Sequence, residues 1–447
     1  MSTGNFKAII VGAGPVGLTA AIVLARAGID FILLESRAKL VVDAGASLVL
    51  QPTGLRILAQ LGLLDAFFSV SSALSILKRC DHNGVDIGET DVPLRFLKNH
   101  GIASRVVSRY DLTKVLYDAI PPSAQAKMHP NKKVRSITTT PSTATVHCTD
   151  GTSYTGSIVI GADGAHSIVR SQMRTLALAD SSTPSSQIND EHPFLATFRC
   201  LWIRYPTHAD IRPGDAAETH GYDLATQSFA GEDTTVTGVY ERLPQPTTER
   251  LRFVPEDEEE IVKRWGHLPI TEQLSLQDVY DARVSSGMVS LEEGVLPNWS
   301  WDRLVLVGDA AHKFTPSTGA GCNQGMADCV VLANELVRIL AASPEPRTED
   351  IARAFGSYQE QRFEKTVAGC AQSGGTTAMA TWSSWFERLL DLWVAGNPWF
   401  LTYRLNRLAA PGIAATPALE FIPDEGLPEG RFPWVRSQGS LMRSVEV

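Results

Sequence analysis

Hydrophobic positions at the start of the chain follow a strand–helix–strand pattern. Ala8 to Val11 is a continuous apolar run, which is typical of a strand buried on both faces. A helix rich in alanine and leucine is predicted over Leu18 to Ala27, and Gly28 suits the position just after its end. Phe31 to Leu34 is a second apolar run. The pattern predicts the opening of an α/β domain.

Two later apolar runs end in glycine and aspartate. Ser157 to Ile160 leads to the turn Ala162-Asp163-Gly164, and Leu304 to Val307 leads to Gly308-Asp309. Glycine beside aspartate is typical of turns, so each run is predicted to be a buried strand that stops there. A glycine-rich segment, Gly319 to Asn323, comes later, and we interpret it as a loop.

Helices and alternating strands account for most of the remaining pattern. A long helix is predicted from about Gln324 to Leu340, and a shorter one with an acidic start from Pro255 to Trp265. Alternating apolar and polar positions predict a meander over Lys133 to Ile158 and a second sheet over Phe194 to Leu251. Tyr280 to Leu291 is expected to be extended.

The region between residues 50 and 120 is less regular. Gln51 to Gly54 is predicted to be a turn, and Val70 to Leu97 to be strand-like with a hairpin turn at His82-Asn83-Gly84. Ser108 is a candidate N-cap for a helix over Tyr110 to Ala119.

Composition narrows the class of protein. A chain of 447 residues with net charge −9 is long enough for two domains, and it lacks the basic surface that nucleic-acid binding needs. The six cysteines show no zinc spacing, so no metal site is expected, and they suggest a reducing compartment. The first strand begins too early for a targeting segment, and no apolar run is long enough to span a bilayer. A cytoplasmic location is expected.

The first glycine cluster has the spacing of a dinucleotide-binding loop. In Gly12-x-Gly14-x-x-Gly17 the first glycine makes the turn, the second admits a pyrophosphate and the third packs helix on strand. Pro15 suits the first position of the helix, whose amides and dipole attract phosphate. Glu35, at the end of the second strand, could accept hydrogen bonds from a ribose. The alternative is a glycine-rich turn in an ordinary α/β domain.

The three strand-end motifs, in this order, resemble those of the group A flavoprotein monooxygenases. Leu291-Glu292-Glu293-Gly294, Trp299-Ser300-Trp301, Gly308-Asp309-Ala310-Ala311-His312 and the early Gly45-Ala46-Ser47 make the chain similar to fungal epoxidases of indole-diterpene and meroterpenoid prenyl chains. The resemblance implies an α/β fold: a Rossmann-like FAD-binding domain of the para-hydroxybenzoate-hydroxylase type, an interleaved β-sheet substrate domain and a helical C-terminal segment. The implied FAD-binding domain covers residues 1–75, 105–175 and 286–345, the substrate domain 76–104 and 176–285, and the C-terminal segment 346–447.

The resemblance also implies which residues hold non-covalent FAD. These are Gly12, Gly14, Pro15, Val16, Gly17, Glu35, Ala46, Arg109, Asp163, Gly164, Gly308, Asp309, Gly319, Ala320, Gly321, Cys322 and Asn323. Some have plainer alternatives: a helix N-cap for Asp309, a turn for Asp163-Gly164, and a surface ion pair for Arg109. His312 and Lys313 are expected to lie behind the residues that contact the cofactor, or on the surface, rather than to take part in the chemistry.

The implied reaction is a monooxygenation. NADPH or NADH would reduce FAD, O2 would form a C4a-hydroperoxyflavin, and one oxygen atom would pass to a prenylated, hydrophobic small molecule by epoxidation or hydroxylation. Arg199 is the candidate catalytic residue if its face of the strand points toward the flavin; the alternative is the solvated face. Competing functions are an aromatic hydroxylase of the salicylate or phenol type, a halogenase, a prenyl reductase and a non-catalytic flavin-binding protein.

An aromatic segment near the C-terminus allows two interpretations. Residues 381–403 contain Trp382, Trp385, Phe386, Trp393 and Trp399. They could form a hydrophobic core or cap over the pocket, which we favour, or they could contact a membrane surface peripherally. The sequence leaves the oligomeric state open.

Overall fold

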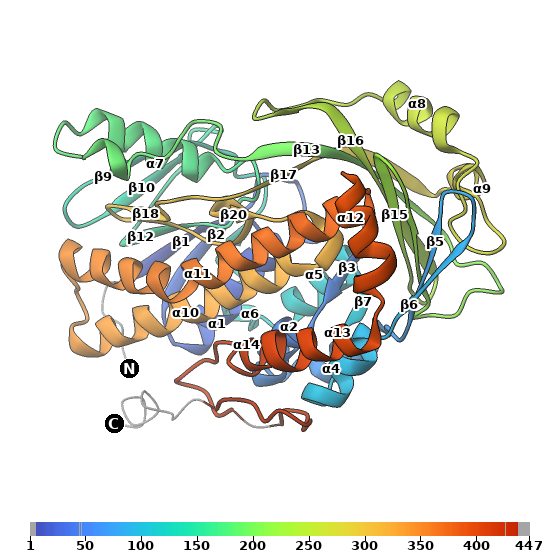
Figure 1. Cartoon of the computed structure of the whole chain (residues 1–447). Coiled ribbons are helices and arrows are strands. Elements are labelled where there is room, and N and C mark those ends of the chain that lie inside the picture. Colours follow the sequence, from blue (N-terminus) through green and yellow to red (C-terminus); the bar gives the residue numbers. More distant parts are fainter. Residues whose placement is uncertain (1–5, 44, 46, 425, 437–447) are drawn as a thin grey trace.

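The computed structural model describes residues 6–43, 45, 47–424 and 426–436. Two large sheets dominate the molecule, and long helices cross in front of the first (Figure 1). The first sheet has six strands in the order β18 (Ser300–Trp301), β19 (Leu304–Leu306), β12 (Ile158–Gly161), β1 (Lys7–Val11), β2 (Asp30–Leu34) and β8 (Met128–His129). From β19 to β8 neighbouring strands are parallel, as in the α/β class predicted from the sequence.

The second sheet has eight strands and receives segments from distant parts of the chain. Its order is β20 (His312–Lys313), β17 (Ser285–Val295), β13 (Leu195–Pro206), β16 (Thr234–Thr247), β15 (Leu224–Ala230), β14 (Ala216–His220), β5 (Leu77–Asp81) and β6 (Asp86–Thr90). Two small sheets complete the strands: β11 (Ser153–Gly156), β10 (Ala144–Cys148) and β9 (Val134–Thr139), and β3 (Ser47–Leu50), β7 (Arg105–Ser108) and β4 (Ser72–Ala73).

The helices surround these sheets. In the first half they are α1 (Pro15–Arg26), α2 (Pro52–Gln60), α3 (Leu64–Phe68), α4 (Val92–His100), α5 (Arg109–Asp118), α6 (Pro122–Gln125), α7 (Ile168–Ala179) and η1 (Ser185–Gln187). In the second half they are α8 (Pro255–Trp265), α9 (Leu276–Asp281), η2 (Gly308–Ala310), η3 (Pro316–Thr318), α10 (Ala320–Ala342), α11 (Thr348–Ala380), α12 (Trp385–Leu390), η4 (Asp391–Ala395), α13 (Pro398–Tyr403), η5 (Arg404–Ala409) and α14 (Ala410–Ala414).

The first sheet is buried on both faces, which explains the unbroken apolar runs. Ile9 and Ile10 point to opposite faces of β1, yet neither is accessible to solvent. α1 and α10 pack against each other, and α7 packs against β12 and β19. The residue boundaries of the two domains stay a prediction.

The second sheet has two different faces. Leu201, Ile203 and Tyr205 of β13 lie in one apolar cluster with residues of α8 and α9, which cover the outer face (Figure 1). Phe198 and Cys200, on the alternate positions, belong to another cluster with Tyr240 and Leu291. The second cluster defines the inner face, because Gln227 on the same face bonds to Ser317 of η3, beside the start of α10.

Several local predictions are confirmed and others are wrong. The helix over Pro255–Trp265, the hairpin between β5 and β6 and the Ser108 cap are present. Gln51 to Gly54 is the start of a helix rather than a turn, because α2 begins at Pro52. Proline suits this position, since the first N–H groups of a helix have no partner within the helix. Part of the predicted strand-like region is the helix α4, and Tyr280 lies in α9. Gly319 to Asn323 is the cap and first turn of α10 rather than a loop.

The aromatic segment does not form a core. Trp385, Trp393 and Trp399 are 70, 74 and 75% exposed, whereas Trp382 is buried. The interpretation of the segment as a core is therefore wrong for its outer tryptophans. Among the described residues, no helix combines the length and the apolar character that crossing a membrane requires.

Candidate functional site

Three strand ends meet at one edge of the first sheet. β1, β12 and β19 are neighbours and parallel, with Val11 opposite Gly161 and Gly161 opposite Leu306. The turns that follow are in contact, since a Cβ atom on Gly12 would lie 2.5 Å from the carbonyl oxygen of Ala162. The carboxyl edge of a parallel sheet is where α/β proteins bind their ligands.

The glycines keep side chains out of this edge. Gly12 has φ +103°, and a Cβ atom on Gly17 would lie 2.0 Å from the Gly12 carbonyl oxygen, so α1 packs directly on the turn. Gly308 has φ +59°, and a Cβ atom there would lie 3.2 Å from the methyl groups of Val16. α1 starts at Pro15 after Gly14, and no side chain caps it. Its first amides therefore remain available for a phosphate.

Glu35 lies at the end of β2 and supports the glycine loop. It is 4% exposed, and its Oε2 accepts a hydrogen bond of 2.8 Å from the backbone N–H of Ala13. Its Oε1 accepts from the backbone and side chain of Arg37 at 2.8 and 3.0 Å. Burial raises the pKa of Glu35, but the bonds from Arg37 and Ala13 outweigh it and lower the pKa. The carboxylate therefore stays charged at the place predicted for the ribose.

Arg109 extends over the glycine loop. It is the first residue of α5, whose cap Ser108 accepts a bond of 3.0 Å from the Asp111 amide. A guanidinium nitrogen of Arg109 is 3.8 Å from the Cβ position of Gly14, and its Cδ is 3.6 Å from that of Gly45. Arg109 is exposed and forms no ion pair with any residue that the structure describes. A surface ion pair, the plainer alternative, is therefore not seen.

The third strand-end motif, Gly308-Asp309, faces the start of α10. Gly319, with φ +66°, is the N-cap of α10, and no side chain caps the helix. The Oδ1 atom of Asp309 is 3.8 Å from the Cβ position of Gly321, in the first turn. Next to it, burial and the charge of Asp309 raise the pKa of Cys322 to about 12, so this thiol stays protonated. The open helix end can stabilise a negative charge.

Two predicted side chains are already used within the protein. Asn323 is buried; its Oδ1 accepts from the amides of Gln51 and Gly54, and its Nδ2 donates to the carbonyls of Val49 and Gly319. Asp163 accepts from the Ile168 and Val169 amides and from Ser167 Oγ, at the start of α7. Their side chains therefore fix the walls of the site. Ala46 lies outside the described residues.

Arg199 is on the wrong face of the second sheet for catalysis. Arg199 and Leu201 lie on one face of β13, and α8 and α9 cover that face. Arg199 Nε bonds to Glu241 Oε2 at 2.7 Å, while Arg264 and Trp265 of α8 bond to Glu241 Oε1 at 2.8 and 2.9 Å. Arg199 therefore attaches α8 to the sheet, and its catalytic assignment is wrong.

The reaction that the sequence resemblance implies, NAD(P)H oxidation coupled to oxygenation, should be unchanged in Arg199→Ala. The free energy of unfolding should fall by about 1–3 kcal/mol, because Glu241 Oε2 loses its donor in a buried position. Urea denaturation and steady-state kinetics measure the two effects. Tyr240→Phe, on the inner face, is the matched comparison and should change coupling instead; lost turnover with Arg199→Ala would contradict the assignment.

A buried triad supports the third motif and was not found from the sequence. Asp328 of α10 accepts bonds from the Gly308 amide at 3.0 Å, His312 Nε2 at 2.6 Å and Arg362 Nε of α11 at 2.8 Å. Burial raises the pKa of Asp328, but the charges of His312 and Arg362 outweigh it and lower the pKa to about 2. His312 is thus a buried supporting residue, while Lys313 pairs with Glu292.

A second charged cluster, also missed, crosses the inner face of the eight-stranded sheet. The Nδ1 of His220 is 2.8 Å from Asp391 of η4 and its Nε2 is 3.2 Å from Glu218, so both ring nitrogens face carboxylates and must donate. Arg79 also bonds to Asp391, at 2.8 Å. Burial alone would lower the pKa of His220, but the two carboxylates raise it to about 9. Alternation in β5 and β14 could have placed Arg79 and His220 on one face, but not Asp391.

This cluster predicts a pH dependence of stability. A histidine whose pKa is raised stabilises the fold fully below pH 6.5, and this contribution is lost as pH rises through about 9. We expect His220→Asn to be less stable than the wild type at neutral pH and to lack the decline between these values. Urea denaturation across this range measures it. The exposed His192→Asn should keep the wild-type profile, and an unchanged profile for His220→Asn would contradict the charged state.

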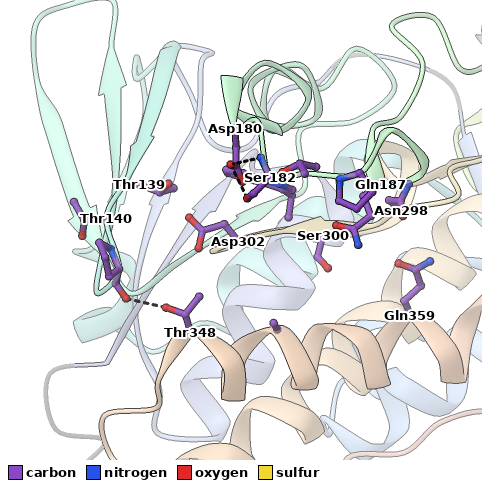
Figure 2. Close-up of a pocket in the computed structure, with 15 residues that line it drawn as sticks. Thr139, Thr140, Asp180, Ser182, Gln187, Asn298, Ser300, Asp302, Thr348 and Gln359 are labelled. Carbon is purple, nitrogen blue, oxygen red and sulfur yellow. Dashed lines mark hydrogen bonds between the residues drawn. The ribbon is translucent and has the colours of Figure 1, made fainter. Parts of the chain in front are cut away.

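A cavity away from this edge is another candidate for a ligand site. It measures about 760 Å³, and its lining includes Thr139 of β9, Ser300 of β18 and Gln359 of α11, together with Asn298 and Asp302 (Figure 2). Asp180 and Asp302 are its charged residues, and their carboxylates would repel a pyrophosphate. None of the three motifs contributes to it, so geometry and charge both favour the strand-end edge as the dinucleotide site.

The parallel sheet, the bare glycine loop and the second sheet facing it form a two-sheet α/β architecture with a loop of the dinucleotide-binding type. A family model described as FAD binding domain matches residues 5–350. Among curated proteins, the FAD-dependent monooxygenase srdH of Neurospora crassa is 32% identical, over 97% of this chain and 99% of that protein. The FAD-dependent monooxygenase verC1 of Penicillium polonicum is 31% identical over 99% of this chain, which spans only 55% of verC1. The chain belongs to this family of FAD-dependent monooxygenases, and FAD is its cofactor.

A solved structure shares the fold. The structure of Klebsiella pneumoniae HpxO complexed with FAD and uric acid has a TM-score of 0.67 at 21% identity, covering 86% of this chain and 91% of that one. At this identity the likeness shows the arrangement of the two sheets and nothing about the substrate. The predicted fold class and cofactor are confirmed, whereas the individual FAD contacts stay predictions.

Proposed function

We propose that the protein uses NAD(P)H and O2 to epoxidise or hydroxylate a prenylated, hydrophobic secondary metabolite. The observation that carries the proposal is the edge where three strand ends meet, with the open starts of α1 and α10. Beside it lies Arg109, which forms no ion pair with a residue that the structure describes. Bound there, FAD would supply the redox chemistry and the activation of oxygen. The chain would hold the phosphates, exclude water and place the substrate.

Each part of the edge has one task in this proposal. The glycine loop and α1 hold the pyrophosphate through backbone amides, and Arg109 adds a positive charge. Glu35 accepts from the ribose, and Asp309 from the ribitol chain. The start of α10 stabilises negative charge on the reduced ring.

The inner face of the second sheet favours an olefin over a phenol as substrate. Hydroxylation of a phenol needs a base, but His220 donates from both nitrogens and Tyr240 donates to Gln227 at 3.0 Å. Burial raises the pKa of Tyr240 well above its usual value. Epoxidation of a prenyl double bond needs no deprotonation, and Phe198, Cys200 and Leu291 supply an apolar surface. Aromatic hydroxylation is the alternative.

The decisive experiment supplies the purified holoprotein with NADPH or NADH and a panel of prenylated aromatics under labelled O2. We expect NAD(P)H oxidation to rise with the right substrate, and mass spectrometry to show one labelled oxygen atom on the prenyl chain. A label on an unprenylated phenol would favour aromatic hydroxylation. Bound FAD without any stimulated oxidation would indicate a non-catalytic flavoprotein, and chloride or bromide incorporation a halogenase.

A further inference from the structure

Two successive helices near the C-terminus expose aromatic stripes. On α12 and η4, Trp385, Leu389 and Trp393 repeat every four residues, and all are exposed. On α13 and η5, Trp399, Tyr403 and Arg407 repeat in the same way, and the rings of Trp399 and Tyr403 stack at 6.1 Å. Side chains four apart lie on one face of a helix, so each helix presents a continuous stripe. We call the two stripes together the aromatic patch.

The aromatic patch belongs to a fixed part of the molecule. The opposite side of α13 and η5 buries Leu401 and Leu405 against Phe96 of α4. Between the stripes, Asp391 is inaccessible to solvent and is bonded to Arg79, His220 and Trp382. A buried carboxylate with these donors holds η4 on the eight-stranded sheet, so the exposed tryptophans are held in place by the fold.

The segment that carries the aromatic patch has a small excess of positive charge in a chain that is negative overall. Residues 384–412, all of which the structure describes, contain Arg388, Arg404 and Arg407 against Glu387 and the buried, paired Asp391. The whole chain carries −9. A local excess of arginine beside exposed tryptophan is complementary to an anionic surface with an apolar interior.

A small cavity adjoins the second stripe. It measures about 330 Å³, and its lining includes Trp399, Tyr403, Arg407, Arg431 and Phe432. Neither arginine forms an ion pair with a residue that the structure describes. Guanidinium groups bind phosphate oxygens, and aromatic rings with polar edges suit the boundary between headgroups and acyl chains. The cavity has the room and the charge for one phosphate-bearing headgroup.

We propose that the aromatic patch and this cavity dock the protein on an anionic phospholipid bilayer. The tryptophans enter the interface, and Arg407 and Arg431 hold a lipid phosphate. This inference deepens the proposed function, since a lipophilic substrate would then reach the inner face of the second sheet from the bilayer. It does not depend on turnover for its test.

The test is co-sedimentation of the FAD-loaded full chain with vesicles of phosphatidylcholine alone or mixed with phosphatidylserine. We expect binding to the mixed vesicles that weakens at high salt. Trp393→Ala with Trp399→Ala should reduce binding to both vesicle types. Arg407→Ala with Arg431→Ala should reduce binding to the mixed vesicles by about tenfold to thirtyfold. Leu178→Ser and Arg135→Ala change an exposed apolar residue and an exposed charge elsewhere, and they should bind as the wild type does.

Three outcomes would overturn the proposal. The wild type could stay in the supernatant with both vesicle types, or the patch variants could sediment as the wild type does. Light scattering could instead show a dimer that the tryptophan variants dissolve, which would make the patch an interface between two copies. The flavin absorbance of every sample separates these outcomes from a failure to bind FAD.

Discussion

Replacing Asp328 with asparagine is expected to be the most destabilising single change near the cofactor site. The carboxylate, inaccessible to solvent, binds Arg362 and His312, which are 1% and 0% exposed. Removing one partner of a buried ion pair leaves the other charge unpaired, which costs about 3–5 kcal/mol. Guanidinium denaturation followed by circular dichroism measures the loss. FAD affinity should fall as well, because the single oxygen of asparagine cannot accept from the Gly308 amide and His312 on one side and from Arg362 on the other.

Asp118→Asn is the matched control for this change. Asp118 pairs with Lys114 on the surface of α5, where both side chains are about half exposed, so its loss should leave the denaturation midpoint nearly unchanged. Equal effects of the two substitutions would show that the triad of Asp328, His312 and Arg362 does not support the fold as its geometry indicates.

The second large effect is expected for Gly12→Ala, which should give protein without FAD. At φ +103° an alanine is strained by about 1–3 kcal/mol. Its Cβ would also lie 2.5 Å from the Ala162 carbonyl oxygen and 2.9 Å from the Asp163 Cα, both of them backbone atoms. We expect FAD affinity to fall on the order of a hundredfold or more, since each tenfold corresponds to about 1.4 kcal/mol. Flavin absorbance after gel filtration and titration with FAD measure it.

Gly356→Ala is the control, because the same glycine-to-alanine change is expected to be tolerated at this position. Gly356 is exposed on α11, and a Cβ there would have no neighbour within 4 Å. Alanine should stabilise this helix by about 0.5–1 kcal/mol and leave FAD bound. If Gly12→Ala retained FAD as Gly356→Ala does, the close approach of the first two strand ends would not be needed for the site.

Local chemistry made part of the site predictable. A strand followed by Gly12, Gly14 and Gly17 has few alternatives, because these turns require positive φ or absent side chains. Ser108 and Pro255 likewise mark helix starts through their own backbone preferences. The predicted helix starts were wrong at Pro52 and Ala320. A turn and the first turn of a helix have similar amino-acid composition, so the sequence does not distinguish them there.

The uses of the polar side chains were not predictable in this way. Asp163, Asn323 and His312 were assigned to the cofactor or to a minor role, yet each bonds to protein groups. Asp163 bonds to the start of α7 and His312 to Asp328 of α10, and Asn323 bonds to Gln51, which is 272 residues away in the chain. In the sequence, Asp328 and Arg362 resemble charged residues on the exposed face of a helix. Their partners become visible only when α10 and α11 pack together.

The sequence by itself determined the order of the elements, the three glycine-bearing strand ends and, through its resemblance, the family. Tertiary structure decided which faces are inside. Alternation in β13 shows that Arg199 and Leu201 share a face. Both faces of that sheet are covered, however, and only the packing shows that α8 covers the face that carries these two residues. The same holds for the aromatic segment: its composition suits a core or a surface, and burial of Leu401 and Asp391 turns its tryptophans outward. Periodicity fixes relative orientation along one element, whereas the choice of inside and outside depends on contacts between distant elements.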